Sequence, residues 1–422
     1  MQVPAQSTNW RTHSRLAAAL VLASLAGSAV ACQRRASEAP WQIAPQASDF
    51  PARPNSAEPQ LTVRGDRAIL SWVEVIEDQN RASRATLKFA ERTSAGWSQP
   101  RDVASGSDWF VNSADLPSVR RLSDNTLAAH WLQRNSEDND EAYDVRLSFS
   151  KDDGRTWTAP GTPHHDGTKT QHGFVSLFET PGGGLGLAWL DGRAMPSEDV
   201  GAMTLRAATF DAAGKQVSDV LVHDRVCECC PTAVAVTSEG PIVAFRNRSP
   251  EEVRDIHVAR LVNGTWTAPT SVHDDGWRIP ACPVNGPAID ARGADVAVAW
   301  FTAPKDEGHA FLAFSRDAGR TFGTPVRLDD AQSTGRVAVT VLTDGSAVAS
   351  WIEFANNQSQ FRLRRVSPSG DRSMAQTIAP AGETSGYPRI ARRGDELVLA
   401  WTGSDKGALS VRTAVAPLPT GR

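Results

Sequence analysis

A unit of two apolar strands recurs seven times along the chain, and this repeat restricts the fold more than any other feature of the sequence. Each unit has an apolar strand, a turn that contains Gly or Asp, and a second strand that carries an aromatic residue near its end. These aromatic markers are Trp72, Trp131, Trp189, Phe245, Trp300, Trp351 and Trp401. Their spacings are 59, 58, 56, 55, 51 and 50 residues. A regular period of this length indicates repeated structural units that pack on one another.

Six of the seven units are followed by a third strand, a turn and a fourth strand. Four antiparallel strands repeated at this period are typical of propeller blades. The sequence therefore predicts an all-β fold, a β-propeller of four-stranded antiparallel blades at residues 59–417, with seven blades and six as the alternative. The last unit has only three obvious strands, and an open edge invites aggregation. The stretch Trp41-Gln-Ile-Ala is predicted to close the ring.

Two turns share the pattern Ser-x-Asp-x-Gly-x-Thr-aromatic. They consist of Ser150, Asp152, Gly154, Thr156 and Trp157, and of Ser315, Asp317, Gly319, Thr321 and Phe322. The pattern resembles the Asp-box of the sialidase-like (BNR-repeat) β-propellers. We expect the Asp to cap the turn, the Gly to adopt a positive φ and the aromatic residue to pack between blades. In that family the Asp-box is structural and lies on the rim opposite the ligand face, so it identifies a fold and no chemistry.

The N-terminal residues predict export and a lipid anchor. Basic residues precede an apolar run at 16–31 that is too short for a membrane span, which is typical of a signal peptide. The run ends in Ala29-Val-Ala-Cys32, which resembles a bacterial lipobox. We expect a lipoprotein signal peptide at 1–31 and lipidation of Cys32, with an ordinary signal peptide as the alternative. The polar, Pro-rich segment that follows predicts a flexible tether at 32–58.

These features predict a cell-envelope protein, lipid-anchored at the outer membrane or the periplasmic face. The residue after Cys32 is Gln33 and not Asp, so the inner-membrane retention signal of such lipoproteins is absent. The net charge is −4 with both signs mixed and no basic stripe, which argues against nucleic acid as the main partner. The expected partners are the membrane, through the anchor, and a glycan, and the protein is expected to be a monomer.

A functional site is expected where the inner strands of the blades begin and where the second strands end. In a propeller these two places lie on the same face. The residues there that are predicted to bind a ligand are Arg193, Arg246, Arg248, Arg389, His172 and Asn285. Arginine suits this role because its planar guanidinium group matches a carboxylate.

The four internal cysteines are the most specific feature of this face. Cys230 and Cys282 each precede a Pro that opens an inner strand, so they are expected to lie side by side. Disulfides are the default in an oxidising compartment, and a Cys230–Cys282 bridge is the natural pairing. Cys227 and Cys229 are too close in sequence to pair without strain. The alternative is a cluster of thiolates that binds Cu or Zn, or a redox-active thiol pair.

The family resemblance also implies a specific chemistry. Sialidases of this fold use three arginines to hold a carboxylate, a Tyr nucleophile paired with a carboxylate, and an Asp acid/base. Tyr387 precedes an inner strand and Asp191 follows a marker aromatic, so these are the catalytic candidates. The early Phe-Arg-Ile-Pro signature of the family is missing, and the cysteines have no role in that chemistry.

The resulting prediction is an envelope lipoprotein whose sialidase-like propeller binds or hydrolyses a glycan at a Cys- and Arg-rich channel face. If it is an enzyme, it is predicted to be a sialidase-like glycoside hydrolase. The alternatives are a metal-binding or thiol-redox propeller that uses the four cysteines, and a non-catalytic scaffold.

Overall fold

The computed structural model describes residues 41–77, 83–197, 200–381, 386–405 and 407–419. The predicted signal peptide, Cys32 and the first part of the predicted tether lie outside these residues. Within the described chain, no helix is long and apolar enough to cross a membrane. A single short 3-10 helix, η1 (Pro304–Asp306), accompanies the strands there.

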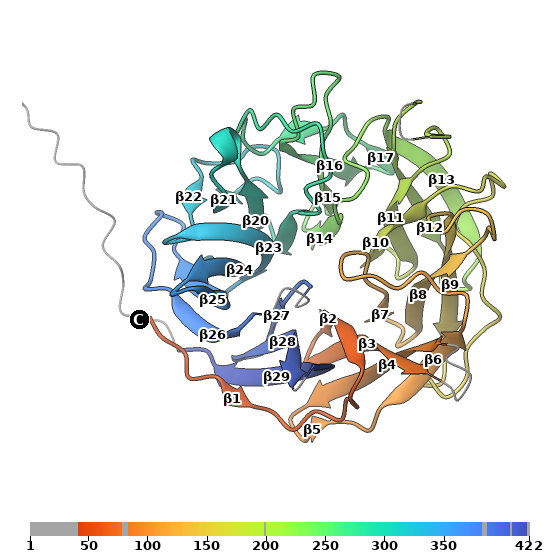
Figure 1. The fold of residues 1–422 in the computed structure, drawn as a ribbon, viewed down its shortest axis with the longest axis horizontal. Helices are drawn as coiled ribbons and strands as arrows, with labels where there is room; N and C mark the ends of the chain where they lie inside the picture. Colours follow the sequence, from red (N-terminus) through yellow and green to blue (C-terminus); the bar gives the residue numbers. More distant parts are fainter. Residues whose placement is uncertain (1–40, 78–82, 198–199, 382–385, 406, 420–422) are drawn as a thin grey trace, which may run out of the picture. The chain divides into compact units, whose positions relative to one another are not determined.

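Seven antiparallel sheets follow one another around a ring and form the blades of a β-propeller (Figure 1). The all-β class and the seven blades are thus confirmed. Blade 1 contains β2 (Ser56–Arg64), β3 (Arg67–Glu77), β4 (Ser83–Thr93), β5 (Gly96–Trp97) and β6 (Arg101–Gly106). Blade 2 contains β7 (Ser118–Arg121), β8 (Leu127–Arg134) and β9 (Tyr143–Ser150). Blade 3 contains β10 (His172–Glu179), β11 (Leu185–Asp191), β12 (Thr204–Phe210) and β13 (Gln216–His223).

Blades 4 to 7 follow the same pattern. Blade 4 contains β14 (Ala233–Thr237), β15 (Gly240–Arg246), β16 (Ile256–Val262), β17 (Thr265–Trp266) and β18 (Thr270–Ser271), and blade 5 contains β19 (Ala288–Arg292), β20 (Asp295–Thr302), β21 (His309–Ser315) and β22 (Val326–Arg327). Blade 6 contains β23 (Gln332–Val341), β24 (Ala347–Ala355), β25 (Gln358–Val366) and β26 (Gln376–Pro380). Blade 7 contains β27 (Arg389–Arg393), β28 (Glu396–Asp405), β29 (Ala408–Pro417) and, from the N-terminal segment, β1 (Gln46–Ala47).

The marker aromatics all lie in the second strand of their blade. These strands are apolar at nearly every position because the neighbouring blades cover both of their faces, and β11 is buried along its whole length. In three blades the marker tryptophan donates its indole N–H to the carboxylate two residues later: Trp72 to Glu74 at 3.0 Å, Trp189 to Asp191 at 2.8 Å and Trp351 to Glu353 at 3.0 Å. The repeated contact satisfies a buried donor and a buried carboxylate together.

The segment before blade 1 closes the ring, as predicted. The paired residues are Gln46 and Ala47, which lie opposite Val415 and Ala414 of β29 (Figure 1). They follow the stretch predicted to pair, whose residues Trp41 and Ile43 instead pack into the core between blades 6 and 7. Ile43 is held there by two backbone hydrogen bonds with the Gln376 side chain, both 3.0 Å. The ring is therefore closed by pairing and by apolar burial.

Both Asp-boxes form the expected turn. Asp152 accepts hydrogen bonds from the backbone N–H and the hydroxyl of Thr156 at 2.9 and 2.7 Å, and Gly154 has a φ of 79°. Trp157 meets Phe89 of blade 1 edge to face at 6.2 Å. The second copy repeats these contacts, with 2.9 and 2.6 Å between Asp317 and Thr321, a φ of 80° at Gly319, and Phe322 packed against blade 4. The boxes follow third strands, as predicted.

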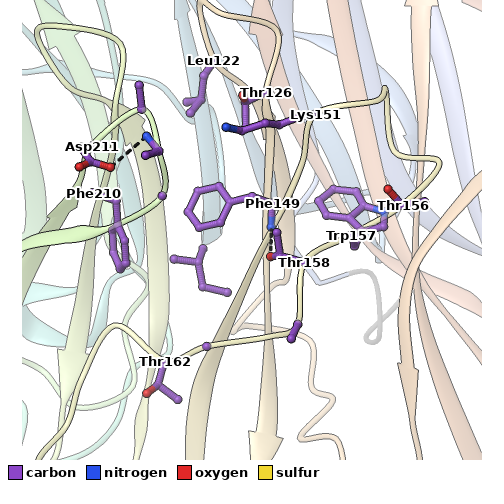
Figure 2. A pocket seen from close by; sticks show the side chains of 16 residues that line it. Leu122, Thr126, Phe149, Lys151, Thr156, Trp157, Thr158, Thr162, Phe210 and Asp211 are labelled. Atoms are coloured by element: carbon purple, nitrogen blue, oxygen red, sulfur yellow. Dashed lines mark hydrogen bonds between the residues drawn. The ribbon is translucent and has the colours of Figure 1, made fainter.

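Blade 2 has no regular fourth strand among the described residues. Only a single bridge joins Leu147 of β9 to Gly161. Pro160 and Pro163 flank this point, and proline cannot donate to a ladder. The irregular segment borders a pocket of about 530 Å³ beside the first Asp-box, lined by Phe149, Trp157 and Phe210 (Figure 2). Asp211 on its rim caps its own turn, accepting from the Ala213 and Lys215 N–H groups at 2.9 Å.

Candidate functional site

The inner strands of all seven blades surround a central cavity of about 170 Å³. A second cavity, of about 500 Å³, opens where blades 1, 2 and 7 meet and is lined by Glu58, Asn112 and Tyr387, among others. Tyr387 lines both spaces. We call Glu58, Asn112, Asp115 and Tyr387 the channel mouth. All four precede or begin inner strands, where the site was predicted.

Two buried carboxyl groups lie at the channel mouth. Glu58 is 6% exposed and Asp115 is 1% exposed. One oxygen of each, Glu58 Oε2 and Asp115 Oδ1, has no hydrogen-bond partner among the described residues. Burial, and secondarily the charge of Asp115, raises the pKa of Glu58 well above its usual value. Glu58 has a φ of 60° at an irregularity of β2, a strained backbone of the kind found at functional sites.

Asp115 is held by its neighbours in one orientation. Burial raises its pKa to about 7, although hydrogen bonds from the Phe174 N–H and the Tyr143 hydroxyl act against this rise. The Tyr143 hydroxyl lies 3.2 Å from Asp115 Oδ2, and the backbone N–H of Asp115 donates to Asn112 at 2.8 Å. Gly173 allows this packing, since a Cβ there would lie 2.0 Å from Asp115 Oδ2. A carboxyl group with a pKa near 7 can both donate and accept a proton at neutral pH.

Tyr387, a predicted nucleophile, does not face a carboxylate. Its hydroxyl donates to the Val284 carbonyl at 2.7 Å, and the Gly286 N–H donates to it at 3.4 Å. Burial raises the pKa of Tyr387, so the phenol stays protonated. Arg336 and Arg389 stack on its ring at 4.5 and 5.3 Å. The tyrosine–carboxylate pair expected at this residue is formed instead by Tyr143 and Asp115.

Asp191, the second catalytic candidate, is fully buried and already occupied. Besides the Trp189 indole, it binds the Arg193 guanidinium group through two contacts of 2.7 and 2.8 Å. Glu74 and Glu353 accept the same tryptophan contact in blades 1 and 6. This internal repetition indicates a structural role for Asp191 in blade 3.

His172 belongs to the same charged network. It is fully buried, its Nε2 lies 3.2 Å from Asp166 Oδ2, and its ring stacks on His164 at 3.8 Å. Burial, together with His172, lowers the pKa of His164 to about 3, so this ring is neutral. The two histidines and nearby carboxylates have metal-ligand spacing. Arg193, however, lies 3.2 Å from Asp166 and already supplies the cation that balances these carboxylates.

The predicted arginines do not converge. Arg246 is buried and donates to three backbone carbonyls, those of Asn285 at 2.8 Å, Arg254 at 2.6 Å and Phe301 at 2.7 Å. Arg248 pairs with Glu252 at 2.8 Å and with Glu228 at 3.5 Å.

Arg389 and Asn285 lie deeper than a ligand-gripping residue would. Arg389 lines the central cavity, and burial lowers its pKa to about 10. The Asn285 side chain bonds the backbone of Pro283, Thr334 and Arg336. No three-arginine carboxylate grip is therefore formed by the predicted residues.

The four internal cysteines lie together, but their pairing differs from the Cys230–Cys282 bridge that the sequence predicts. Cys229 and Cys282 form a disulfide that joins the loops before blades 4 and 5, and we call them the outer pair. Cys282 is exposed and Cys229 half-buried. Cys227 and Cys230 are buried free thiols, the inner pair. A bridge to Cys230 was the expected one; its side chain instead points inward toward Cys227.

The inner pair lies beside the outer pair. The Cys227 sulfur is 2.7 Å from that of Cys230 and 3.8 Å from that of Cys229. Arg254, which is buried, donates to the Cys227 sulfur at 3.4 Å. Burial acts to raise the pKa of Cys227, but the hydrogen bond with Cys230 and the charges of Arg246 and Arg254 outweigh it and lower that pKa. The Cys230 pKa is raised by burial.

Sequence reasoning did not single out Glu58 or Arg254. One signal was present for Glu58: Pro follows Glu58, Cys230 and Tyr387 alike, in the first residues of an inner strand or just before it. Glu58 was not predicted because it is the last residue of the polar segment that the sequence predicts to be a tether. Arg254 carries no comparable signal, because nothing local relates it to Cys227, 27 residues away.

Comparison with solved structures supports the fold. A polysaccharide lyase, Uly1, aligns over 86% of this chain and 90% of its own, with 10% identity and a TM-score of 0.51. The α-L-arabinofuranosidase Arb93A from Fusarium graminearum aligns over 74% and 95%, with 15% identity and a TM-score of 0.50. The NanB sialidase of Streptococcus pneumoniae aligns over 89% and 94%, with 10% identity and a TM-score of 0.46.

No family model and no curated protein matches the sequence. The chain thus has a fold like that of the Uly1 lyase and the Arb93A arabinofuranosidase, and both Asp-box turns of its β-propeller form as predicted. At these identities the likeness establishes the fold, and any activity has to be argued from the site.

Proposed function

We propose that this protein is a glycan-directed β-propeller whose site is the channel mouth. The observation that carries the proposal is Glu58, a buried carboxyl group with one free oxygen that lines a cavity of about 500 Å³. A second buried carboxyl group, that of Asp115, lies close enough for its charge to raise the pKa of Glu58. Buried carboxyl groups without full hydrogen bonding are costly and are retained where a ligand or a reaction uses them. Propellers of similar fold include a polysaccharide lyase and an arabinofuranosidase, which supports a glycan as the ligand.

The cavity favours an uncharged sugar. Its described lining contains Val75, Val111 and Leu409 together with the Asn112 amide, and it contains no arginine or lysine. Apolar side chains suit the faces of a sugar ring, whereas the amide suits its hydroxyl groups. An acidic sugar would bring its carboxylate into a cavity whose described lining offers no cation to pair with it, which is unfavourable. The three-arginine grip that a sialic acid requires is not formed by the predicted residues.

The chemistry that fits these residues is hydrolysis. Glycosidases use one carboxyl group as an acid and a second as a base or nucleophile. Glu58 lines the cavity, and its raised pKa keeps it protonated, so it suits the proton transfer to the leaving oxygen. Asp115, with a pKa of about 7 and a hydrogen bond from the Tyr143 hydroxyl, is the second carboxyl group. Tyr387 lines the cavity and keeps its proton.

The test is a binding and turnover screen of neutral and acidic oligosaccharides. Binding is measured by calorimetry and cleavage by the appearance of reducing ends, with wild type, Glu58→Gln and Asp115→Asn. We expect a neutral oligosaccharide to bind, Asp115→Asn to abolish cleavage, and Lys151→Ala, beside the pocket on the opposite face, to behave as wild type. Binding that is lost only in the Lys151 variant, or no binding across the panel, would sink the proposal and favour a scaffold.

The lipid anchor remains a proposal about the same chain. Because the described propeller starts at Trp41, only residues 33–40 separate Cys32 from it. Eight residues span at most about 28 Å, so an anchored propeller would lie close to the membrane surface. Mass spectrometry of the N-terminal peptide from envelope fractions tests this, and an unmodified Cys32, or a chain that begins elsewhere, would exclude it.

A further inference from the structure

We propose that the four internal cysteines form an intramolecular thiol–disulfide relay, in which the buried inner pair reduces the exposed outer disulfide and is oxidised in its place. This activity is independent of glycan binding. It follows from three observations: Cys229 and Cys282 are bridged, Cys227 and Cys230 are not, and the sulfurs of Cys227 and Cys229 lie 3.8 Å apart. A thiolate that contacts a disulfide sulfur can attack it.

Cys227 is the attacking residue because of what surrounds it. It contacts Cys229 and Cys230, and Arg254 donates to its sulfur. Arg254 is itself held by Glu228 and Glu252, both at 2.9 Å. Glu228 lies between Cys227 and Cys229 in the chain, so the ion pair positions the guanidinium group within the cluster. A fixed cation beside a cysteine stabilises its thiolate.

The exchange has two steps and needs no external oxidant. In the first, the Cys227 thiolate attacks Cys229 Sγ, forms a Cys227–Cys229 bond and releases Cys282 as a thiolate. In the second, Cys230 gives up its proton, which the thiolate released from Cys282 takes up, and its sulfur attacks Cys227 Sγ, forms a Cys227–Cys230 bond and releases Cys229. One disulfide and two thiols are present before and after, and two protons pass from the inner pair to the outer pair. The reducing equivalents thereby move from the interior to the surface.

The difference in exposure between the two cysteine pairs determines the direction in which the relay passes reducing equivalents. The inner pair is 1% exposed at each residue, so no external protein disulfide can reach it. Cys282 is exposed. Through the relay, the buried thiols become available to an external disulfide at Cys282, which would be a substrate or a redox partner of the envelope.

Native labelling followed by peptide mapping tests the relay. The full chain, purified without added oxidant or reductant, is treated at neutral pH with a polyethylene-glycol maleimide, acid-quenched and digested with trypsin. Trypsin places Cys282 on peptide 279–292 and the other three cysteines on peptide 226–246. In wild type we expect label on Cys282, together with a Cys227–Cys230 disulfide.

Two serine variants make the test sharp. Cys227→Ser lacks the attacking thiolate, so the outer disulfide persists and Cys282 stays unlabelled. Cys230→Ser stops after the first step. The Cys227–Cys229 bond is strained, so it persists only because the label on Cys282 prevents the reverse attack, and the label then appears together with linked Cys227 and Cys229. Cys227→Ala repeats the first variant with an apolar residue, in case serine at this buried position prevents folding, which circular dichroism reports.

The opposing results are equally distinct. Label on Cys282 that persists in folded Cys227→Ser or Cys227→Ala would show that another route opens the outer disulfide, and would overturn the relay. Wild type with Cys282 unlabelled, or with two complete disulfides as purified, would overturn it as well.

Discussion

The Tyr387 hydroxyl donates a 2.7 Å hydrogen bond to the Val284 carbonyl, and this contact joins the two parts of the protein that carry chemistry. Tyr387 lines the cavity at the channel mouth, and Val284 lies two residues after Cys282 of the outer disulfide. The loop before blade 5 therefore contacts both the proposed glycan site and the proposed relay.

The pKa of Asp115 predicts an unusual pH dependence of stability. A carboxyl group whose pKa is raised to about 7 on folding contributes stability below its unfolded value near 4 and loses it as the pH rises to 7. Asp115→Asn cannot ionise and keeps the shape of the side chain. We expect it to raise the free energy of unfolding by about 2–4 kcal/mol at pH 8 and to change it little at pH 4. Urea denaturation at both pH values measures this, and an equal effect at both would contradict the assigned pKa.

Arg246 predicts a structural and not a ligand-binding phenotype. Arg246→Met leaves three buried carbonyls without their donor, so we expect a loss of about 3 kcal/mol or more in unfolding free energy. Arg248→Met is the matched control, because Arg248 contacts only partly exposed carboxylates, and we expect about 1 kcal/mol or less. Denaturation of both variants checks the difference. Similar losses in the two would show that the buried bonds of Arg246 carry no special weight.

The outer disulfide predicts that the two cysteine pairs contribute differently to the free energy of unfolding. It links residues 53 positions apart, so replacing both Cys229 and Cys282 with Ser is expected to cost about 2–4 kcal/mol. Replacing both Cys227 and Cys230 with Ser keeps the bridge and serves as the control. Thermal unfolding of the two double variants measures the difference, which should vanish once wild type and control are also reduced.

The closure of the ring predicts how far the N-terminus can be shortened before the protein self-associates. A chain that starts at Trp41 keeps β1 and the apolar contacts of Trp41 and Ile43. A chain that starts at Asp49 exposes the edge of β29, and unpaired edges aggregate. We expect the first to be monodisperse and the second to self-associate, as measured by light scattering after size exclusion. Identical monomers from both would mean that blade 7 does not depend on the N-terminal strand.

The fold could be read from the sequence because its information is periodic. The spacing of the aromatic markers and the two Asp-boxes indicate blades, since each blade must bury both faces of its second strand. Even the closing strand was predicted from the odd apolar pair Trp41 and Ile43, although pairing occurs a few residues later. Only the missing fourth strand of blade 2 departs from the repeat, where two prolines interrupt the ladder.

The sequence predicts where along the chain a site would lie, but not which side chains meet there. Tyr387 and Cys282 both precede inner strands, and the structure brings their loops together through the hydrogen bond from Tyr387 to Val284. Which side chains touch there depends on the few ångströms by which neighbouring loops are displaced, and no local pattern encodes that. The same arginine type can grip a ligand or bond three carbonyls, as Arg246 does, and only its surroundings decide.

The sequence by itself thus determined the seven-bladed ring, its Asp-box turns, its closure and the face on which function is expected. The tertiary structure alone decided that Glu58 and Asp115 lie near one another, and that Cys229 pairs with Cys282 while Cys227 lies unbridged beside them. The physical reason is that a repeat reports contacts made within a unit and between adjacent units. Burial, charge coupling and disulfide choice arise from loops brought together only when the ring closes.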